Sequence, residues 1–491
     1  MVLIQRRPPY PFLGIPEIRD RIASYLDRKD CLSCIRVSIE WHHYFLRPIW
    51  ETIDFEKDDA TFDKATSEVL AKYGGFISQV VNISDLGHLQ ALQHSKINAL
   101  KVIKAQVSVS SIYQQILSDT IQRSEGSLQL IDLFAEPSIP DTLMEQRKHG
   151  KHYFNISYTI SSTLNLPGEG KGLTTLLLTR LCLSRESFSS LLQRCPSLRE
   201  LTLNQVSLFN HMPSLTLFTG SKLQCLVASF SQVWDLDPHD LSAPSLLTHF
   251  PLLEKWHVPS LARSCNASLA VMRQDISRYC LVLKHIRFDQ GDPAMASTLL
   301  AKTFGGLETC VLSARVLAAS TILGLAAHQN SLTSLYITKA CAPIFTDVVR
   351  EDGTLRDATT AQWLYMIPRL CHRLRVLSLE SFVCDIEDIE NNVWACTDLQ
   401  ELGLCVKDLD SVQDIEACIK HVCNQRRAPR TVDLERFQNS ETIVARTARY
   451  LLRFKYLKTV CLGTQAYSLP SPSCSCRIVH GEKKNVHPSF F

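Results

Sequence analysis

The chain has 491 residues, which is too long for one compact core and predicts several domains or a solenoid. Apolar residues make up 45% and charged residues 21%, the balance of a folded soluble protein, and the formal charge of +3 is too small to indicate a nucleic-acid partner. No stretch reaches the roughly 18 apolar residues of a membrane-spanning helix, and residues 1–11 lack the apolar run of a secretory signal. We therefore expect a cytoplasmic or nuclear protein, without a membrane partner, whose 18 cysteines are buried thiols rather than disulfides.

Residues 12–55, after the leader 1–11, predict three short helices. Pro16 suits the first position of a helix, Glu17 its positive dipole end, Asp30 can cap the second helix, and the third begins near Ser38. The apolar residues of the three helices are Ile18, Ile22, Tyr25 and Leu26; Cys31, Leu32, Ile35 and Val37; and Trp41, Tyr44, Phe45 and Leu46. So small a module rarely sustains its own core. It therefore either packs as the N-terminal cap of the following domain or offers an apolar face to a partner.

The same residues resemble the F-box family, whose pattern is roughly L-P-x-E-[IL], I-x-x-[YF]-L, D-[LC]-L, V-[SC]-x-x-W and a closing tryptophan. The matching residues are Ile15, Pro16, Ile18, Ile22, Tyr25, Leu26, Asp30, Leu32, Val37, Ser38, Trp41 and Trp50. Ile15 replaces the usual leucine, one residue is missing around Glu17, and Cys31 takes an apolar place. The resemblance implies docking onto a Skp-family linker. The predicted linker contacts are Ile15, Pro16, Ile18, Ile22, Leu26, Leu32, Val37 and Trp41, some of which must instead hold the helices together.

A repeat follows the connecting segment 56–75 and occupies residues 76–465 as about 11–13 irregular copies of L-x-x-L-x-L. The clear copies are Leu173/Leu176/Leu178, Leu198/Leu201/Leu203, Leu332/Leu335/Ile337, Leu374/Leu377/Leu379 and Leu399/Leu402/Leu404. Marginal copies lie at Leu100/Ile103/Ala105 and Pro429/Val432/Leu434. Most steps between first positions are 24–30 residues, a regularity that chance would not give. Longer steps before 173 and 374 contain polar insertions, and residues 466–491 predict a flexible tail.

Each repeat predicts a short strand with its last two apolar residues inward, preceded by a segment with helical spacing. One such unit cannot bury its apolar face alone, so neighbouring repeats stack. The predicted fold is thus α/β, a solenoid with parallel strands on the concave side and helices on the convex side. It resembles the leucine-rich repeats, in particular their cysteine-containing subtype. The cysteines three positions before a first leucine are Cys195, Cys280, Cys371 and Cys396. The family's asparagine or cysteine eight positions after that leucine is replaced by Val206, Ala340 and Phe382, which predicts irregular curvature.

Outward strand positions of the concave face are the predicted contacts for a target protein. They are Glu200, Thr202, Asn204, Lys255, His257, His285, Arg287, Ser334, Tyr336, Thr338, Ser378 and Glu380. Charges of both signs occur among them, so a highly charged target is not favoured, and Tyr336 is the best aromatic anchor.

No motif in the chain predicts catalysis, a metal site or a cofactor. Residues 168–174 lack the glycine spacing and the Lys-Ser/Thr pair of a phosphate-binding loop. Cys31 and Cys34 have redox spacing, but they lie inside a helix, where packing is the better explanation. A final group was also considered for zinc, but its spacing matches no paired-ligand frame. Its members are Cys461, Cys474, Cys476 and His480.

The two resemblances together imply a substrate-recognition adaptor of an SCF-type, cullin–RING ubiquitin ligase. Such a chain is not an enzyme. Its F-box holds the Skp-family linker and through it the ligase, and its repeats hold an unidentified protein substrate. The alternative is an interaction scaffold with leucine-rich repeats whose F-box-like segment no longer binds a linker.

Overall fold

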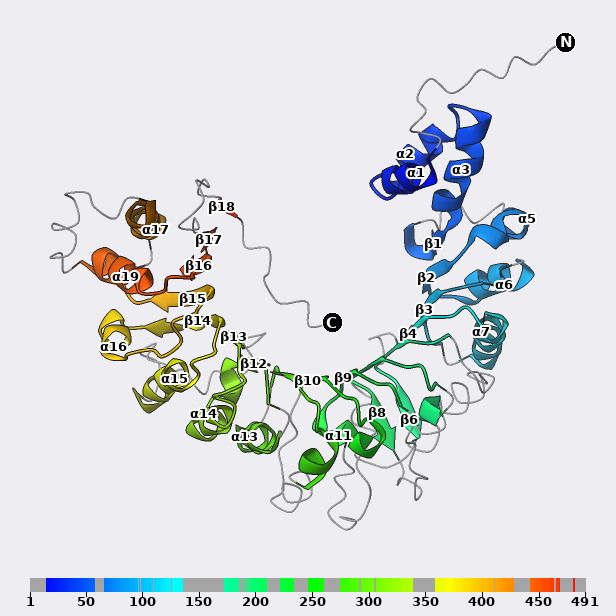
Figure 1. The fold of residues 1–491 in the computed structure, drawn as a ribbon. Coiled ribbons are helices and arrows are strands. Elements are labelled where there is room, and N and C mark those ends of the chain that lie inside the picture. Colours follow the sequence, from blue (N-terminus) through cyan, green and yellow to red (C-terminus); the bar gives the residue numbers. More distant parts are fainter. Residues whose placement is uncertain are drawn as a thin grey trace, which may run out of the picture. The chain divides into compact units, whose positions relative to one another are not determined.

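The computed structural model is described in two compact units, an N-terminal unit (Met1–Pro213) and a C-terminal unit (Ser214–Phe491) (Figure 1). The residues that the structure describes are 15–57, 66–95, 97, 99–108, 110–124, 126–135, 172–184, 188, 191–193, 195–209, 221–233, 246–259, 274–290, 293–303, 306–338, 358–409, 411–427, 442–462, 465–468 and 480–481. Each unit is an α/β layer of parallel strands and covering helices, consistent with a solenoid.

Three helices open the N-terminal unit, where the sequence predicts them: α1 (Pro16–Ala23), α2 (Arg28–Cys34) and α3 (Ile39–Trp50). Proline occupies the first turn of α1. The Asp27 carboxylate accepts a hydrogen bond from the Asp30 N–H (2.7 Å), and the Ser38 hydroxyl accepts one from the Trp41 N–H (3.1 Å). These side chains satisfy amide groups that a helix start otherwise leaves without partners, and so fix where α2 and α3 begin.

The rest of the N-terminal unit is a parallel sheet. Its strands are β1 (Thr52–Asp54), β2 (Gln79–Ile83), β3 (Val102–Gln106), β4 (Leu130–Phe134), β5 (Thr175–Thr179) and β7 (Glu200–Asn204), each paired with the next. The helices α5 (Thr66–Tyr73), α6 (Leu86–His94) and α7 (Ser111–Arg123) lie together on one face of the sheet (Figure 1). Two further strands, β6 (Cys182–Ser184) and β8 (Ser207–Phe209), form a small parallel pair of their own.

The parallel strands begin before residue 76, where the solenoid was predicted to start. Strand β1 already pairs with β2, and α5 lies in the segment predicted as a connection. The physical reason is that Trp50, Ile53 and Phe55 repeat the spacing of the later strands with bulkier apolar residues. Ile53 and Phe55 are fully buried. The first repeat therefore overlaps the end of the predicted helical module.

The C-terminal unit continues the same plan. Its strands are β9 (Cys225–Val227), β10 (Lys255–Val258), β11 (His285–Phe288), β12 (Thr309–Ser313), β13 (Ser334–Thr338), β14 (Val376–Cys384), β15 (Glu401–Val406) and β16 (Thr459–Leu462), all parallel. Its longer helices are α13 (Pro293–Lys302), α14 (Ala319–Ala326), α15 (Ala358–Leu370), α16 (Ile386–Asn391), α17 (Val412–Arg427) and α19 (Ile443–Leu452). They lie on one side of the strands in Figure 1. In both units we call the opposite side, which carries the side chains that alternate with the buried ones, the strand face.

Two expectations for the end of the chain are corrected. The marginal copy Pro429/Val432/Leu434 lies outside the described residues, and no strand from it separates β15 from β16, because these two strands pair directly. The segment predicted as a flexible tail contains strands. β17 (Gln465–Ser468) pairs antiparallel with β16, and β18 (His480–Gly481) pairs antiparallel with β17. Only Gly463 and Thr464 separate β16 from β17, a spacing and composition typical of a hairpin.

The four cysteines in register are buried, as the repeat pattern predicts. The N–H of the first leucine of the repeat donates to the cysteine carbonyl three positions earlier: Leu198 to Cys195 at 3.1 Å, and Leu374 to Cys371 at 3.2 Å. Burial raises the pKa of Cys280 to about 12 and that of Cys371 to about 11. These thiols are therefore protonated at neutral pH and pack as small apolar groups.

The missing asparagine of the repeat does not abolish a regular turn. Arg180 and Gln205 follow β5 and β7 at equivalent positions and both have left-handed backbone, with φ of 58° and 55°. Their side chains meet, with Arg180 Nε donating to Gln205 Oε1 at 2.9 Å. The next residues, Leu181 and Val206, are buried. Buried apolar side chains therefore occupy the positions at which the leucine-rich-repeat pattern has asparagine or cysteine.

We expect Leu335→Ala to lower the free energy of unfolding by about 2–5 kcal/mol, because Leu335 is fully buried between the rows of neighbouring strands. The control Leu323→Ala removes the same atoms from an exposed position of α14. It should change the free energy of unfolding by less than about 0.5 kcal/mol. Urea unfolding followed by circular dichroism measures both. Equal losses in the two variants would contradict the described burial.

Candidate functional site

The three-helix module has a small core of its own. Cys31, Phe45 and Ile49 are buried at its centre. The partly buried apolar residues packed against them are Ile22, Ala23, Leu26, Cys34, Ile35, Trp41, Tyr44 and Trp50. Trp41 lies against Phe45, with ring centroids 5.3 Å apart. The module therefore uses one face of each helix to hold the three helices together.

Of the eight predicted linker contacts, three belong to this core: Ile22, Leu26 and Trp41. A fourth, Ile18, is half-buried. The remaining four are exposed to solvent, namely Ile15, Pro16, Leu32 and Val37. The structure thus separates residues that hold the helices together from residues available to a partner, which the sequence left mixed.

Two exposed apolar residues of the module, Tyr25 and Ile39, were absent from the predicted contacts. Their side chains are 77% and 80% exposed. Tyr25 was counted among the apolar residues of the predicted first helix, but α1 ends at Ala23, so the helical spacing does not extend to it. Ile39 directly follows the capping residue Ser38, where the first turn of α3 projects from the core. The helix ends are the signal that could have identified both.

Polar contacts fix α1 against α3. The Arg19 guanidinium lies 3.6 Å from the Glu40 carboxylate and 4.5 Å from the centre of the Tyr44 ring. The Tyr44 hydroxyl donates a hydrogen bond to Asp20. Burial, and then the bond to Asp20, raises the pKa of Tyr44 well above its ordinary value, so the phenol remains a donor. The orientation of α1 is therefore set by more than apolar packing.

The closing tryptophan of the module connects it to the first repeat. The Trp50 ring stacks on Tyr73 of α5, with centroids 4.6 Å apart and planes 10° apart. The guanidinium of Arg28, in α2, lies over the Trp50 ring, 5.7 Å from its centre. The module is thus packed against α5 of the first repeat.

In the N-terminal unit, the predicted target contacts Glu200, Thr202 and Asn204 lie on β7, on the strand face. Glu200 and Asn204 are exposed and Thr202 is half-buried. The Thr175 hydroxyl of the neighbouring strand donates to Glu200 at 3.4 Å. An ion pair that was not predicted, Lys104 to Asp132 at 3.8 Å, lies on the same face. Burial raises the pKa of the Asp132 carboxyl, and the charge of Lys104 partly offsets this.

In the C-terminal unit, most of the predicted contacts come together in two rows that cross the strands. From β10 to β14, the first row is Lys255, His285, Thr309, Ser334 and Val376, and the second is His257, Arg287, Val311, Tyr336 and Ser378. Val311 is only 1% exposed although it belongs to the outward set. Thr338 lies in a further row, with its hydroxyl 3.5 Å from the Leu312 carbonyl oxygen. Glu380 lies in β14 beyond Ser378, where the register with β15 shifts.

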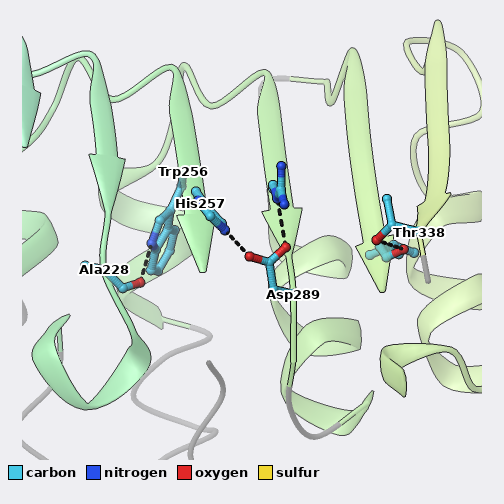
Figure 2. A network of polar contacts seen from close by, with 7 residues as sticks. Ala228, Trp256, His257, Asp289 and Thr338 are labelled. Atoms are coloured by element: carbon cyan, nitrogen blue, oxygen red, sulfur yellow. Dashed lines mark hydrogen bonds and ion pairs between the residues drawn. The ribbon is translucent and has the colours of Figure 1, made fainter. Parts of the chain in front are cut away.

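Asp289 lies on this face but was not among the predicted target contacts. It follows β11 and accepts hydrogen bonds from His257 Nε2 (2.6 Å) and Arg287 Nε (2.8 Å) (Figure 2). Burial alone would raise the pKa of Asp289, but the bonds and charges of His257 and Arg287 outweigh it and lower the pKa. In the same strand as His257, the buried Trp256 donates from Nε1 to the Ala228 carbonyl oxygen at 3.2 Å. The contact with Asp289 therefore orients the His257 ring on the strand face.

Tyr336, the predicted aromatic anchor, is half-buried in the second row. Burial, with a smaller contribution from the negative charge of Glu401, raises the pKa of its phenol to about 12. It is thus neutral at physiological pH and offers an apolar ring edge with one hydroxyl donor.

No cluster of metal-ligating side chains is found among the described residues. Of the four residues weighed as zinc ligands, Cys461 and His480 lie in strands, while Cys474 and Cys476 are outside the described part of the chain, as are residues 168–171 of the glycine-rich segment. None of the helices in the described ranges is long and apolar enough to cross a membrane.

Comparisons with known proteins give little beyond this geometry. No protein-family model matches the chain, and no curated protein matches it. A solved structure described as the complex of Rad7 and Elc1 in yeast is similar at a TM-score of 0.35 and 12% identity, over 83% of this chain and 97% of that chain. A similarity at this level carries no argument about function.

We expect Asp289→Asn to destabilise the protein in a pH-dependent way. A lowered folded-state pKa means that the carboxylate contributes stability above its unfolded pKa of about 3.8, and that this contribution is lost as the pH falls through the lower folded value. The difference in unfolding free energy between the wild type and the variant should be constant near neutrality and shrink below about pH 4.

Denaturant unfolding at a series of pH values measures that difference. The control is Asp398→Asn, which changes an exposed aspartate and should leave stability almost unchanged throughout. A difference for Asp289→Asn that grows on acidification would contradict the described network.

Proposed function

We propose that the chain is a substrate-recognition adaptor of an SCF-type, cullin–RING ubiquitin ligase, in which the three-helix module binds a Skp-family linker. One observation carries this proposal. The module leaves Ile15, Tyr25, Leu32, Val37 and Ile39 exposed within a stretch that also contains a formed core. Exposed apolar side chains in such density are typical of a surface that another protein covers. The likeness of this stretch to the F-box pattern supports the choice of partner.

The strand faces then serve as the surface for the protein to be modified. The rows on β10 to β14 combine basic, hydroxyl, aromatic and apolar side chains on a sheet that its buried core keeps rigid. Such a surface can bind a target without reacting with it. An adaptor of this kind accelerates ubiquitin transfer by raising the local concentration of target lysines near the charged conjugating enzyme. We propose no catalytic group in the chain.

The test for linker binding uses the exposed residues, since variants of the module core would also unfold it. We expect Leu32→Asp combined with Val37→Asp to abolish capture of a purified Skp-family linker, because charge on an apolar interface is left desolvated and unpaired. The control Val393→Asp introduces the same charge at an exposed apolar position of the C-terminal unit and should retain binding. Affinity capture with the purified linker measures linker binding by the wild type, the double variant and the control.

Circular dichroism should show that each variant remains folded. If the wild type fails to capture the linker, the adaptor proposal is wrong and the interaction scaffold takes its place. If the double variant binds as well as the wild type, the exposed residues are not the docking surface.

A further inference from the structure

Four basic side chains form a block on two adjacent strands of the C-terminal unit. The register pairs Lys255 with His285 and His257 with Arg287, so the four lie side by side on the strand face of β10 and β11. Neighbouring strands are about 4.8 Å apart, and side chains on one face of a strand about 7 Å apart. A single small anion can therefore reach several of these groups at once.

Asp289 organises the block without neutralising it. It binds His257 Nε2 and Arg287 Nε through its two oxygens, at 2.6 Å and 2.8 Å (Figure 2). Arg287 thus uses its inner nitrogen for Asp289, and among the described residues its two terminal nitrogens have no hydrogen-bond partner. Within the same part of the chain, Lys255 has no ion-pair partner. An oriented guanidinium with its fork unoccupied matches the two oxygens of a carboxylate.

The charges of the block favour a singly charged ligand. Lys255 and Arg287 contribute two positive charges and Asp289 one negative charge, and the burial of His285 beside Lys255 lowers the pKa of its imidazole and favours the neutral form. At the start of the strands, Lys284 is paired with Glu308 at 3.6 Å, and the charge of Glu254 adds a negative contribution at His285. A dianion would place its second charge beside Asp289, which repels it.

The row that contains Arg287 continues into an apolar and aromatic surface. The next two positions across the strands are Val311, which is buried, and Tyr336, whose half-buried ring is the part that a ligand can contact. Tyr336 is two strands, or roughly 10 Å, from Arg287. An extended peptide advances by about 3.3 Å per residue, so this distance corresponds to about three residues of a bound segment. The block and the ring can therefore read one acidic and one apolar side chain of the same segment.

We propose that the strand face at β10 and β11 binds a carboxylate side chain of the target protein, held by Arg287 and Lys255, within a segment that places an apolar side chain on Tyr336. The inference deepens the proposed function and rests on the strand face being the target-binding surface. It fails separately from linker docking, because the two are measured on different parts of the chain.

The test selects binding peptides from a random library. The selection is run in parallel against the full-length wild type and against the Lys255→Ala/Arg287→Ala double variant. We expect peptides enriched on the wild type to carry Asp or Glu, with an apolar residue about three positions away, and this enrichment to be absent on the variant. The most enriched peptide is then synthesised, with its acidic residue also replaced by Gln and by phosphoserine, and affinities are measured by fluorescence anisotropy.

For the acidic peptide, the double variant should weaken binding about tenfold or more, the loss expected for one charge-assisted contact. The Gln peptide should bind both proteins equally weakly, which a double-mutant cycle makes explicit. The control Lys284→Ala removes a nearby positive charge at the strand edge and should change affinity little.

Three results would overturn the proposal. Peptides selected equally by both proteins would exclude the basic block as the binding site. Tighter binding of the phosphoserine peptide would replace the carboxylate with a dianion. Displacement of the selected peptide by a short oligothymidylate at lower concentration would indicate a nucleic-acid surface instead of a peptide site.

Discussion

A strand of four or five residues with one apolar face cannot bury that face by itself, so every strand of this protein depends on the register with its neighbours. Leu335 lies between Cys310 and Leu377 across the sheet, and Ile337 lies beside Leu312. Each of these side chains is buried. A slip of one residue would turn all of them to solvent. The inward rows therefore determine where every outward side chain lies.

The two candidate surfaces differ in the size of the core that supports them. On the strand face, alternation along the strand leaves every second residue free for other roles while the buried rows keep its position. In the three-helix module, few residues are available for a core: Cys31, Phe45 and Ile49 form it, and Trp50 adds a stacking contact with Tyr73. The remaining apolar residues stay outside. The first surface is thus a consequence of a large shared core, and the second of a small one.

The sequence predicted the strand rows well because their period is strict. Leu176 and Leu201, or Leu335 and Leu377, were identified from spacing alone and lie opposite each other in the sheet. The first repeat was missed because Trp50, Ile53 and Phe55 replace its leucines. The exposure of Tyr25 depends on α1 ending two residues earlier, which spacing does not reveal.

The network of Asp289 could not be predicted for a different reason. His257 and Asp289 are 32 positions apart in the chain, and they meet only because β10 and β11 pair in one particular register. The repeat pattern indicates that register for the strand residues, but Asp289 lies one position beyond β11, and the pattern makes no prediction for residues that follow a strand.

The hairpin at the end of the C-terminal unit determines where the parallel array stops. The outer edge of a parallel sheet presents a row of unsatisfied amide and carbonyl groups, which another chain can extend. Here β17 runs antiparallel along β16 from Ser468 to Gln465, and the two residues of β18 then cover part of β17. A strand that reverses direction cannot accept a further repeat in the same register. The hairpin thus ends the parallel array at β16, because a further parallel repeat finds no matching edge there.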